Sequence, residues 1–438
     1  MRLYSTKDTS HQATLSEAVM RGLPPDNGLY MPYDIPALPA TFFKQLPEMR
    51  LPEIGFQICQ NLFGETIPEA DLREICQRAL TFPAPVHTLD GQRHILELFH
   101  GPSLAFKDFG ARFMAQLMSY FNRNADQNLT ILVATSGDTG GAVAAGFYQT
   151  PGIEVVILYP SGKVSPLQEK QLTTLGHNIQ ALEIDGTFDD CQALVKQAFL
   201  DRELTQKRRL SSANSINIAR LIPQSFYYFE TYRQLSDKDT PLAFVVPSGN
   251  FGNLTAGLFA KKMGLPVEHF VAATNINDVV PTYLKTGTFQ PKPSVRTLSN
   301  AMDVGNPSNF ARMEDLFQNT DCSTWNSMQQ KVLGYAYTDA QTETAMRELE
   351  QQYQYVIDPH GAVGYLAMND YLRTHPQHQA VLLETAHPAK FLEDVERILG
   401  HKIDIPERLA RLKVLPKKAT SLGTDYPSFR QWLLDTAE

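Results

Sequence analysis

The stretch LAFVVPSGNFGNLTAGLFAKKM, residues 242–263, indicates the architecture of this chain most directly. Its first five residues are apolar or β-branched, which is typical of a short buried strand. Residues 254–263 have the composition of a helix, and the glycines at 249 and 252 permit a tight turn between the two elements. The stretch therefore predicts a strand that turns directly into a helix, the repeating unit of a parallel sheet.

The same unit recurs along the chain from about residue 90 onward. Further strands are predicted at 129–134, 154–159, 179–184, 270–274 and 380–384, separated by helical stretches. This alternation predicts an α/β fold with open, mostly parallel sheets flanked by helices. The first 85 residues differ: they are mainly helical and end in the proline-rich stretch FPAP at 82–85.

Length, charge and cysteine content restrict the class of protein. A chain of 438 residues is too long for one minimal core. Its net charge of −8 argues against nucleic acid or an anionic membrane as partner, and no apolar run is long enough to span a bilayer. The four cysteines are scattered without a metal-binding spacing, so we expect buried, reduced thiols and no metal site. We expect a cytoplasmic protein.

The turn PSGNFGN at 247–253 places backbone N–H groups at a helix N-terminus, where an anion is favoured. It can be a phosphate cradle, although for an isolated turn of this kind a plain strand–helix connection with glycines for packing is favoured. It lacks the GxGxxG pattern of dinucleotide-binding proteins, and no Gly-Lys-Ser/Thr follows. These absences disfavour an NAD-dependent or ATP-dependent enzyme and favour a ligand with one phosphate.

Two further turns carry polar groups at predicted helix starts. The turn ATSGDTGG at 134–141 offers hydroxyl and N–H groups that could hold a carboxylate, or it is an ordinary connection. In ELFHGPSLAFKDFG at 97–110, Lys107 lies between phenylalanines where a helix begins. A helix N-terminus and apolar neighbours both disfavour the ammonium form, so we expect a lowered pKa for Lys107, as a lysine nucleophile requires. The alternative is a solvated surface lysine.

Taken together, the three turns resemble those of the threonine synthase family, which belongs to the fold-type-II (tryptophan-synthase-β-like) pyridoxal-phosphate (PLP) enzymes. The resemblance extends in order over nearly the whole chain. Further matching stretches are YSTK (4–7), GLYMP (28–32), LYP (158–160), SPLQEK (165–170), SANSIN (212–217), NAMDV (300–304) and ETAHPAKF (384–391).

The resemblance implies a two-lobed PLP enzyme that converts O-phospho-L-homoserine and water into L-threonine and phosphate, as a monomer or homodimer. It divides the chain into an N-terminal segment at 1–85, a catalytic region at 90–400 and a helical tail at 401–438. The two lobes of the catalytic region fall at about 90–235 and 240–400. The alternatives are a threonine dehydratase, a phospho-lyase that makes 2-oxobutyrate, and a non-catalytic PLP-binding protein. The stretches 212–217 and 385–391 favour the synthase.

The resemblance also assigns roles to single residues. Lys107 would carry PLP and act as the catalytic base, and the hydroxyl of Thr385 would meet the pyridine nitrogen. The loop around the cofactor phosphate would be formed by Gly249, Asn250, Phe251 and Asn253. The substrate α-carboxylate would be held by the loop with Thr135, Ser136, Asp138 and Thr139. The substrate phosphate would be bound among Lys163, Ser215, Asn217 and Arg220.

Two positions depart from related sequences. The family often has Asp where this chain has Asn253, and a neutral amide there should ease anion binding. Related fold-type-II enzymes often have Asn where this chain has Asp138, an aspartate that closer relatives share.

Overall fold

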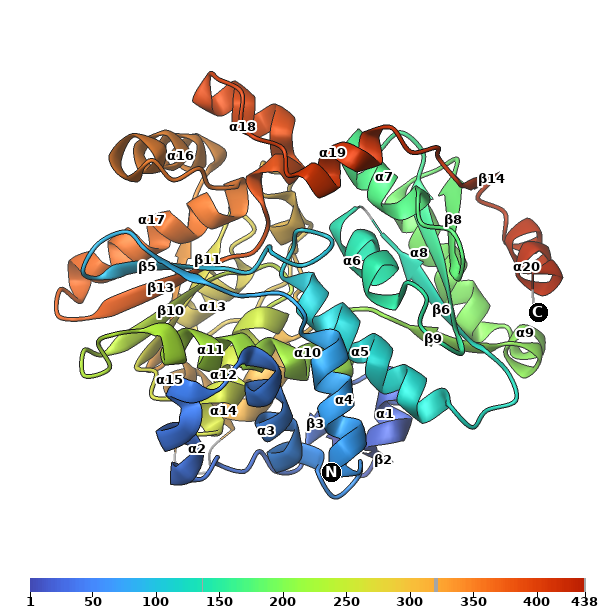
Figure 1. The fold of residues 1–438 in the computed structure, drawn as a ribbon, viewed down its shortest axis with the longest axis horizontal. Helices are drawn as coiled ribbons and strands as arrows, with labels where there is room; N and C mark the ends of the chain where they lie inside the picture. The colour runs from blue at the N-terminus through green and yellow to red at the C-terminus, as the bar shows by residue number, and fades with distance from the viewer. Residues whose placement is uncertain (136, 319–321, 437–438) are drawn as a thin grey trace.

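Two open sheets stand on either side of helix α5 (Lys107–Asn122) in the computed structural model, which describes residues 1–135, 137–318 and 322–436 (Figure 1). The six-stranded sheet, on the left of the figure, has the order β12-β11-β10-β13-β5-β4. Its strands are β4 (Val86–Thr88), β5 (Arg93–Glu97), β10 (Leu242–Pro247), β11 (His269–Thr274), β12 (Val332–Ala336) and β13 (Gln379–Glu384).

The five-stranded sheet, on the right of Figure 1, has the order β14-β8-β7-β6-β9. Its strands are β6 (Leu129–Ala134), β7 (Ile153–Pro160), β8 (Ile179–Ile184), β9 (Arg209–Ser212) and β14 (Thr420–Leu422). Neighbouring strands are parallel in both sheets except for β4, which pairs antiparallel with β5. The predicted α/β class with mostly parallel sheets is confirmed.

All six predicted strands are present, and their bounds differ from the prediction by one residue at most. Helices cover both faces of each sheet, so the central strands are buried on both sides. Their residues therefore form continuous apolar runs, which are recognisable in the sequence. In β10 every residue is buried, as expected for a parallel strand in the middle of a sheet.

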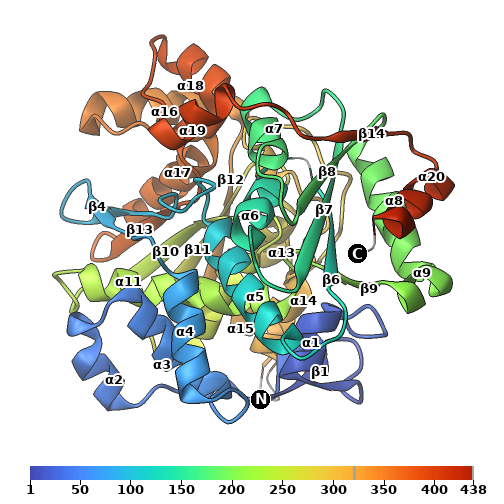
Figure 2. The same ribbon diagram turned by 45° about the vertical axis from the view of Figure 1, so that its right-hand side comes forward.

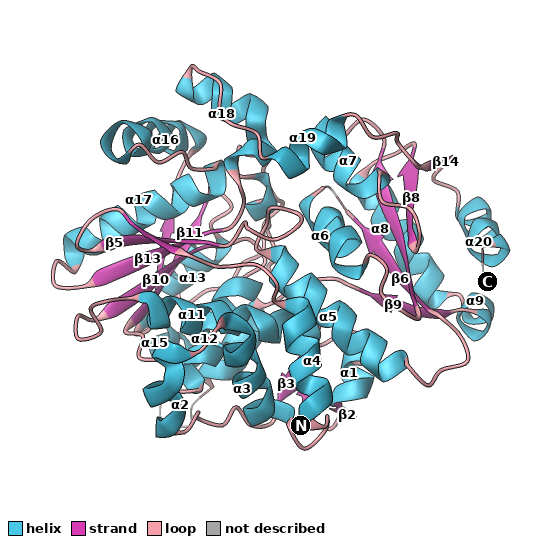
Figure 3. Ribbon diagram, viewed as in Figure 1, coloured by secondary structure: helices cyan, strands magenta, loops and turns pink. Residues whose placement is uncertain are grey.

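Helices flank both sheets (Figure 3). One face of the six-stranded sheet packs against α17 (Pro359–Thr374), and the other against α12 (Gly252–Lys262) and α13 (Val279–Thr286). The smaller sheet packs between α6 (Asp138–Phe147) and α8 (Phe188–Leu200). The other helices of the catalytic region are α7 (Pro166–Thr173), α9 (Arg202–Lys207), α10 (Ile218–Leu221), α11 (Phe226–Gln234), α14 (Phe310–Phe317), α15 (Thr324–Gln329), α16 (Asp339–Tyr353) and α18 (Leu392–Leu399).

The N-terminal segment is mainly helical, as expected, and its helices α3 and α4 pack against α11 and α5 respectively. Its helices are α1 (Leu15–Arg21), α2 (Ala40–Gln45), α3 (Leu51–Phe63) and α4 (Glu69–Ala79). It also contains an antiparallel sheet of β1 (Arg2–Ser5), β2 (Gln12–Thr14) and β3 (Tyr30–Pro32), which the sequence did not predict. Strands of three or four residues are too short to show an alternating pattern.

The C-terminal segment crosses from one sheet to the other (Figure 2). Helix α19 (Glu407–Lys413) leads to β14, which pairs with β8, and α20 (Tyr426–Asp435) packs on α8. The predicted helical tail therefore includes one strand. The predicted first lobe, at about 90–235, does not coincide with the smaller sheet. Strands β4 and β5 precede that sheet in sequence but belong to the larger one.

Two properties of the described residues complete the fold. None of their helices combines the length and apolar character needed to cross a membrane. Cys59, Cys76 and Cys191 are free and buried, as predicted, whereas Cys322 is exposed, because it lies in the loop before α15 rather than in a core element.

Candidate active site

The predicted site residues follow three neighbouring strands of the larger sheet. Strands β10, β13 and β5 lie side by side and run parallel, so their carboxyl ends meet at one edge. The turn 247–253 follows β10, Thr385 follows β13, and the segment leading to Lys107 follows β5. Ligands of open α/β sheets bind outside the carboxyl ends of the strands. The sheet order thus brings together three segments that are far apart in sequence.

Backbone hydrogen bonds join the segment before Lys107 to the segment after β13. The N–H of Phe106 donates to the Thr385 carbonyl over 2.9 Å, and the N–H of His387 donates to the Leu104 carbonyl over 3.1 Å. Leu104 has a φ of 58°, a left-handed conformation that is uncommon for a residue with a side chain. The turn and these bonds fix Lys107, the first residue of α5, beside Thr385.

The Lys107 amine is largely shielded from water, with 18% of the side chain exposed. Burial lowers the pKa of this amine, the Asp138 carboxylate 3.9 Å from Nζ opposes the shift, and the charges of Lys390 and Arg220 lower the pKa further. The lowered pKa expected from the sequence is confirmed, with two neighbouring cations as additional causes. Lys107 can therefore lose its proton more readily than an exposed lysine.

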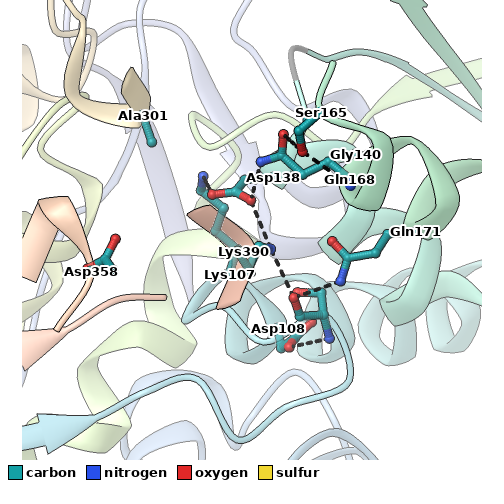
Figure 4. Close-up of polar contacts among 12 residues, drawn as sticks. Lys107, Asp108, Asp138, Gly140, Ser165, Gln168, Gln171, Ala301, Asp358 and Lys390 are labelled. Atoms are coloured by element: carbon teal, nitrogen blue, oxygen red, sulfur yellow. Dashed lines mark hydrogen bonds and ion pairs between the residues drawn. The ribbon is translucent and has the colours of Figure 1, made fainter. Parts of the chain in front are cut away.

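Asp138, the first residue of α6, is a counter-ion to two lysines rather than an anion-binding group (Figure 4). Its Oδ1 lies 2.8 Å from Lys390 Nζ and accepts a 3.0 Å hydrogen bond from the Gln168 amide. Burial alone would raise the pKa of Asp138, but Lys390 and Lys107 outweigh burial and hold the pKa well below its usual value. A carboxylate repels a substrate carboxylate, so within this loop the N–H and hydroxyl groups stay the predicted carboxylate ligands, and the Asp138 side chain pairs with the lysines.

The remaining residues of this turn have different environments. The Thr135 hydroxyl is buried and accepts hydrogen bonds from the N–H groups of Gly137 and Gly140, at 3.0 and 2.9 Å. Thr135 therefore shapes the turn and supports the start of α6, and its predicted contact with a substrate carboxylate stays a prediction. Thr139 is partly exposed in the first turn of α6. Ser136 lies outside the described residues.

The turn after β10 holds a strained backbone at the start of α12. Phe251 is buried in the left-handed region, with a φ of 60°. Such a conformation costs on the order of 1–3 kcal/mol and is commonly found at ligand-binding turns. Asn250 links this turn to two other segments: its Nδ2 donates to Ser215 Oγ over 2.8 Å, and its Oδ1 accepts the Ser308 N–H over 2.6 Å.

Unsatisfied donors at this turn fit a bound phosphate. The Oδ1 of Asn253 accepts hydrogen bonds from Tyr227 and Tyr228, at 2.7 and 2.9 Å, whereas its buried Nδ2 has no partner among the described residues. The buried Nδ2 of Asn309 also lacks one there, and it lies 3.4 Å from the position of a Cβ added to Gly252. Buried donors without partners are rare, and the first N–H groups of a helix add to them. The residues present therefore fit the phosphate of PLP.

Thr385 is preceded by the buried carboxyl group of Glu384 and followed by residues 386–391, the rest of the stretch ETAHPAKF. Burial and the nearby charge of Asp358 raise the pKa of Glu384 well above its usual value. Asp358 accepts a 2.5 Å hydrogen bond from His360 Nδ1, and His360 Nε2 accepts the Ala301 N–H over 3.1 Å. This chain of contacts supports the turn at 300–302, which packs against Gly249.

The four residues predicted for the substrate phosphate fall in two parts of the chain. Ser215, Asn217 and Arg220 are close in sequence, and the Arg220 N–H donates to the Asn217 carbonyl over 2.9 Å. The side chain of Asn217 caps α10 by accepting the Ala219 N–H, and it donates to the Val19 carbonyl. Lys163 is exposed in the turn after β7. Among the described residues, no hydrogen bond or ion pair joins it to the other three. Ser215 contacts Asn250 at the phosphate turn.

Arg220 lies deep in the site and not in a surface ion pair. It is buried, its Nη1 donates to the Ala213 carbonyl over 2.7 Å, and its Nε has no partner among the described residues. Burial lowers its pKa to about 10. An unpaired guanidinium N–H near Lys107 keeps Arg220 as a candidate anion ligand.

Sequence reasoning missed Lys390, Asn309 and the His360–Asp358 pair. Lys390 lies within the stretch ETAHPAKF, which resembles the family, but the sequence does not show that it pairs with Asp138. Asn309 and His360 follow no recognised turn, and only the folded chain brings them to the site.

Substituting Gly249 by Ala should weaken PLP binding. A Cβ there would lie 2.8 Å from both the Ala301 carbonyl oxygen and the Met302 Cα, which are backbone atoms. Either the turn at Gly249 or the backbone at 301–302 must move to make room for the Cβ, at a cost of about 1–3 kcal/mol. We therefore expect PLP affinity to fall by about tenfold or more. Titration of the apoprotein with PLP measures the change. Gly91→Ala, where nothing lies within 4 Å of the added Cβ, is the matched control. Equal affinities in both variants would contradict the cradle.

The chain matches three family models. The model described as "Pyridoxal-phosphate dependent enzyme" matches residues 85–384, "Threonine synthase N terminus" matches 2–80, and "Threonine synthase, C-terminal" matches 361–432. Within the described residues, no group of three or more His, Cys, Asp or Glu side chains is arranged to hold a metal ion.

Relatives match over the full length. The threonine synthase of Escherichia coli is 48% identical over 437 residues, which cover 99% of this chain and 100% of that protein. The crystal structure of threonine synthase from E. coli superposes with a TM-score of 0.90 at 46% identity, covering 99% and 100% of the two chains. The PLP-bound threonine synthase from Brucella melitensis superposes with a TM-score of 0.94 at 33% identity, covering 100% of both.

Proposed function

The chain belongs to the threonine synthase family of PLP-dependent enzymes, and on that premise we propose that it converts O-phospho-L-homoserine and water into L-threonine and phosphate. One observation carries the residue assignments. The Lys107 amine, Thr385 and the start of α12 with its unsatisfied Asn253 amide meet at one edge of the larger sheet.

The residues at this edge match the chemical groups of PLP. Lys107 would hold the cofactor covalently, the turn 249–253 would bind its phosphate, and the Thr385 hydroxyl would face its ring nitrogen. When bound, PLP supplies an electron sink for negative charge at the substrate Cα. The protein contributes orientation, electrostatics and proton transfer.

Lys107 is the residue that moves protons in this account. Its amine, freed by the substrate amine, takes the proton from Cα and then one from Cβ, and the phosphate group leaves from Cγ. Cγ then takes up a proton and becomes the methyl group, water adds at Cβ, and a proton returns to Cα. A base for these steps must be neutral at working pH, which the lowered pKa of Lys107 favours.

Control of water decides between threonine and a keto acid. Water must reach Cβ after the phosphate group has left, whereas early hydrolysis would release 2-oxobutyrate. We infer that the lobe carrying the 135–139 turn and the N-terminal segment close over the substrate and regulate this access. The cytoplasmic location and the choice between monomer and homodimer stay predictions.

An isotope experiment tests the proposed reaction. In heavy-oxygen water, cleavage of the Cγ–O bond and addition of water at Cβ place the label in the threonine hydroxyl and leave the released phosphate unlabelled. Attack of water on phosphorus would label the phosphate and yield homoserine. Mass spectrometry of both products distinguishes the two, and labelled phosphate would overturn the proposal.

A further inference from the structure

Lys390 is a buried lysine that reaches the same carboxylate as Lys107 (Figure 4). It lies in the short 3₁₀ helix Pro388–Phe391, directly after the segment that is hydrogen-bonded to the turn before Lys107. Its Nζ lies 2.8 Å from Asp138 Oδ1 and donates a 2.9 Å hydrogen bond to the Ser103 carbonyl. Only 1% of the side chain is exposed. A buried ammonium group needs a paired charge, and Asp138 supplies it.

The two lysines are not equivalent partners of Asp138. Oδ1 forms the short contacts, with Lys390 at 2.8 Å and the Gln168 amide at 3.0 Å, whereas Oδ2 is 3.9 Å from Lys107 Nζ. The longer distance is beyond a hydrogen bond. Asp138 therefore makes its direct ion pair with Lys390 and not with Lys107.

We infer that Lys390 is a positioning residue that engages the Asp138 carboxylate and thereby leaves the Lys107 amine free to deprotonate and bind PLP. The inference rests on the proposed role of Lys107 as the cofactor lysine. Without Lys390, Asp138 would pair with Lys107 alone. An ammonium group held in a direct buried ion pair is a poor nucleophile.

Titratable groups from several elements face this cluster and remain in place when Lys390 is changed. Arg220 of α10 lowers the pKa of Lys107, as Lys390 does. His360 of α17, whose Nε2 accepts the Ala301 N–H and whose Nδ1 donates to Asp358, also lies near Asp138. Asp108, next to Lys107 in α5, accepts the Ser103 N–H over 2.9 Å, and burial raises its pKa to about 6.

Helix α7 contributes neutral amides only to these contacts: Gln168 donates to Asp138, and Gln171 donates to the Ser103 carbonyl over 3.0 Å. The Ser103 carbonyl thus keeps a donor when Lys390 is replaced, which makes a neutral substitution at this position a test of charge.

The direction of the effect follows from these charges. Lys390→Gln removes a positive charge that lowers the pKa of Lys107 and leaves Asp138, which raises it. A larger share of Lys107 is then protonated at neutral pH. Capture of PLP should therefore slow at neutral pH and recover at alkaline pH. Asp138→Asn combined with Lys390→Gln removes both opposing charges, of which Asp138 has the larger effect, and should restore capture at neutral pH to at least the wild-type rate.

The experiment adds PLP to apoprotein of the wild type, Lys390→Gln and the double variant over a range of pH. The visible absorbance of lysine-bound PLP gives the capture rate, and borohydride reduction followed by peptide mass analysis identifies the lysine. We expect Lys390→Gln to capture PLP about tenfold more slowly than the wild type at neutral pH, with the deficit closing at alkaline pH. Thermal unfolding of each variant verifies that it is folded.

Two outcomes would overturn the inference: identical pH profiles for the wild type and Lys390→Gln, or equal slowing at every pH in both variants, which a purely structural role would produce. Failure of wild-type apoprotein to capture PLP on Lys107 would instead overturn the proposed function.

Discussion

Replacing Lys107 by Ala is expected to abolish the visible absorbance of lysine-bound PLP and to reduce threonine formation by about 10⁴-fold or more. Ala has no amine to hold the cofactor or to move protons at Cα and Cβ. Because the turn 249–253 stays intact, PLP should still bind through its phosphate, only weakly and without the lysine bond. Absorbance spectra after desalting, together with product assays, measure both losses.

A matched control separates the loss of the amine from a general effect of removing a lysine. Lys262→Ala removes an exposed lysine at the end of α12 and should leave the spectrum and activity of the wild type. A Lys107→Ala protein that retains both the absorbance band and the activity would contradict the assignment of Lys107.

Thr385→Asp is expected to shift the products from threonine toward 2-oxobutyrate. A hydroxyl facing the ring nitrogen does not hold a proton there, whereas a carboxylate does. A protonated ring draws negative charge away from Cα. Less charge is then available to expel the phosphate group from Cγ, and the reaction is diverted from threonine toward the keto acid. A change of about 1.4 kcal/mol in the competing barriers corresponds to a tenfold change in product ratio, which is the size of effect that we expect.

Thr385→Ser is the control for this substitution because it retains a hydroxyl at the same position. The Phe106 N–H donates to the carbonyl of residue 385, so neither substitution removes the bond that fixes Lys107. The ratio of 2-oxobutyrate to threonine should change in Thr385→Asp and stay near that of the wild type in Thr385→Ser. An unchanged ratio in the aspartate variant would count against the role of the Thr385 hydroxyl.

Local patterns were sufficient to predict the framework of the fold. The apolar run at 242–246 and the glycine turn after it predicted β10 and the start of α12, because a central parallel strand and its turn are recognisable from a few residues. The placement of β5 was not predictable in this way. Its pairing with β13 joins residues 93–97 to residues 380–384, and such long-range pairing leaves no local signal.

The sequence predicted those features of the site that depend on neighbouring residues, and not those that depend on contacts between distant parts of the chain. The position of Lys107 between phenylalanines already indicated a lowered pKa, because apolar neighbours signal burial, which is the largest cause of the shift. Thr135 and Asn217 were assigned to ligands, but hydroxyl and amide groups in turns also cap helices, and both residues do so. The ion pair between Asp138 and Lys390 was not predictable, because Lys390 lies more than two hundred residues further along the chain.

The central claim is that this site makes threonine from O-phospho-L-homoserine. The most direct test is to incubate the purified, PLP-loaded protein with that substrate and to quantify phosphate, threonine and 2-oxobutyrate together. The account predicts equal amounts of phosphate and threonine with little 2-oxobutyrate. Phosphate accompanied by 2-oxobutyrate in place of threonine would identify a phospho-lyase, and no release of phosphate would contradict the substrate; either result would refute the claim.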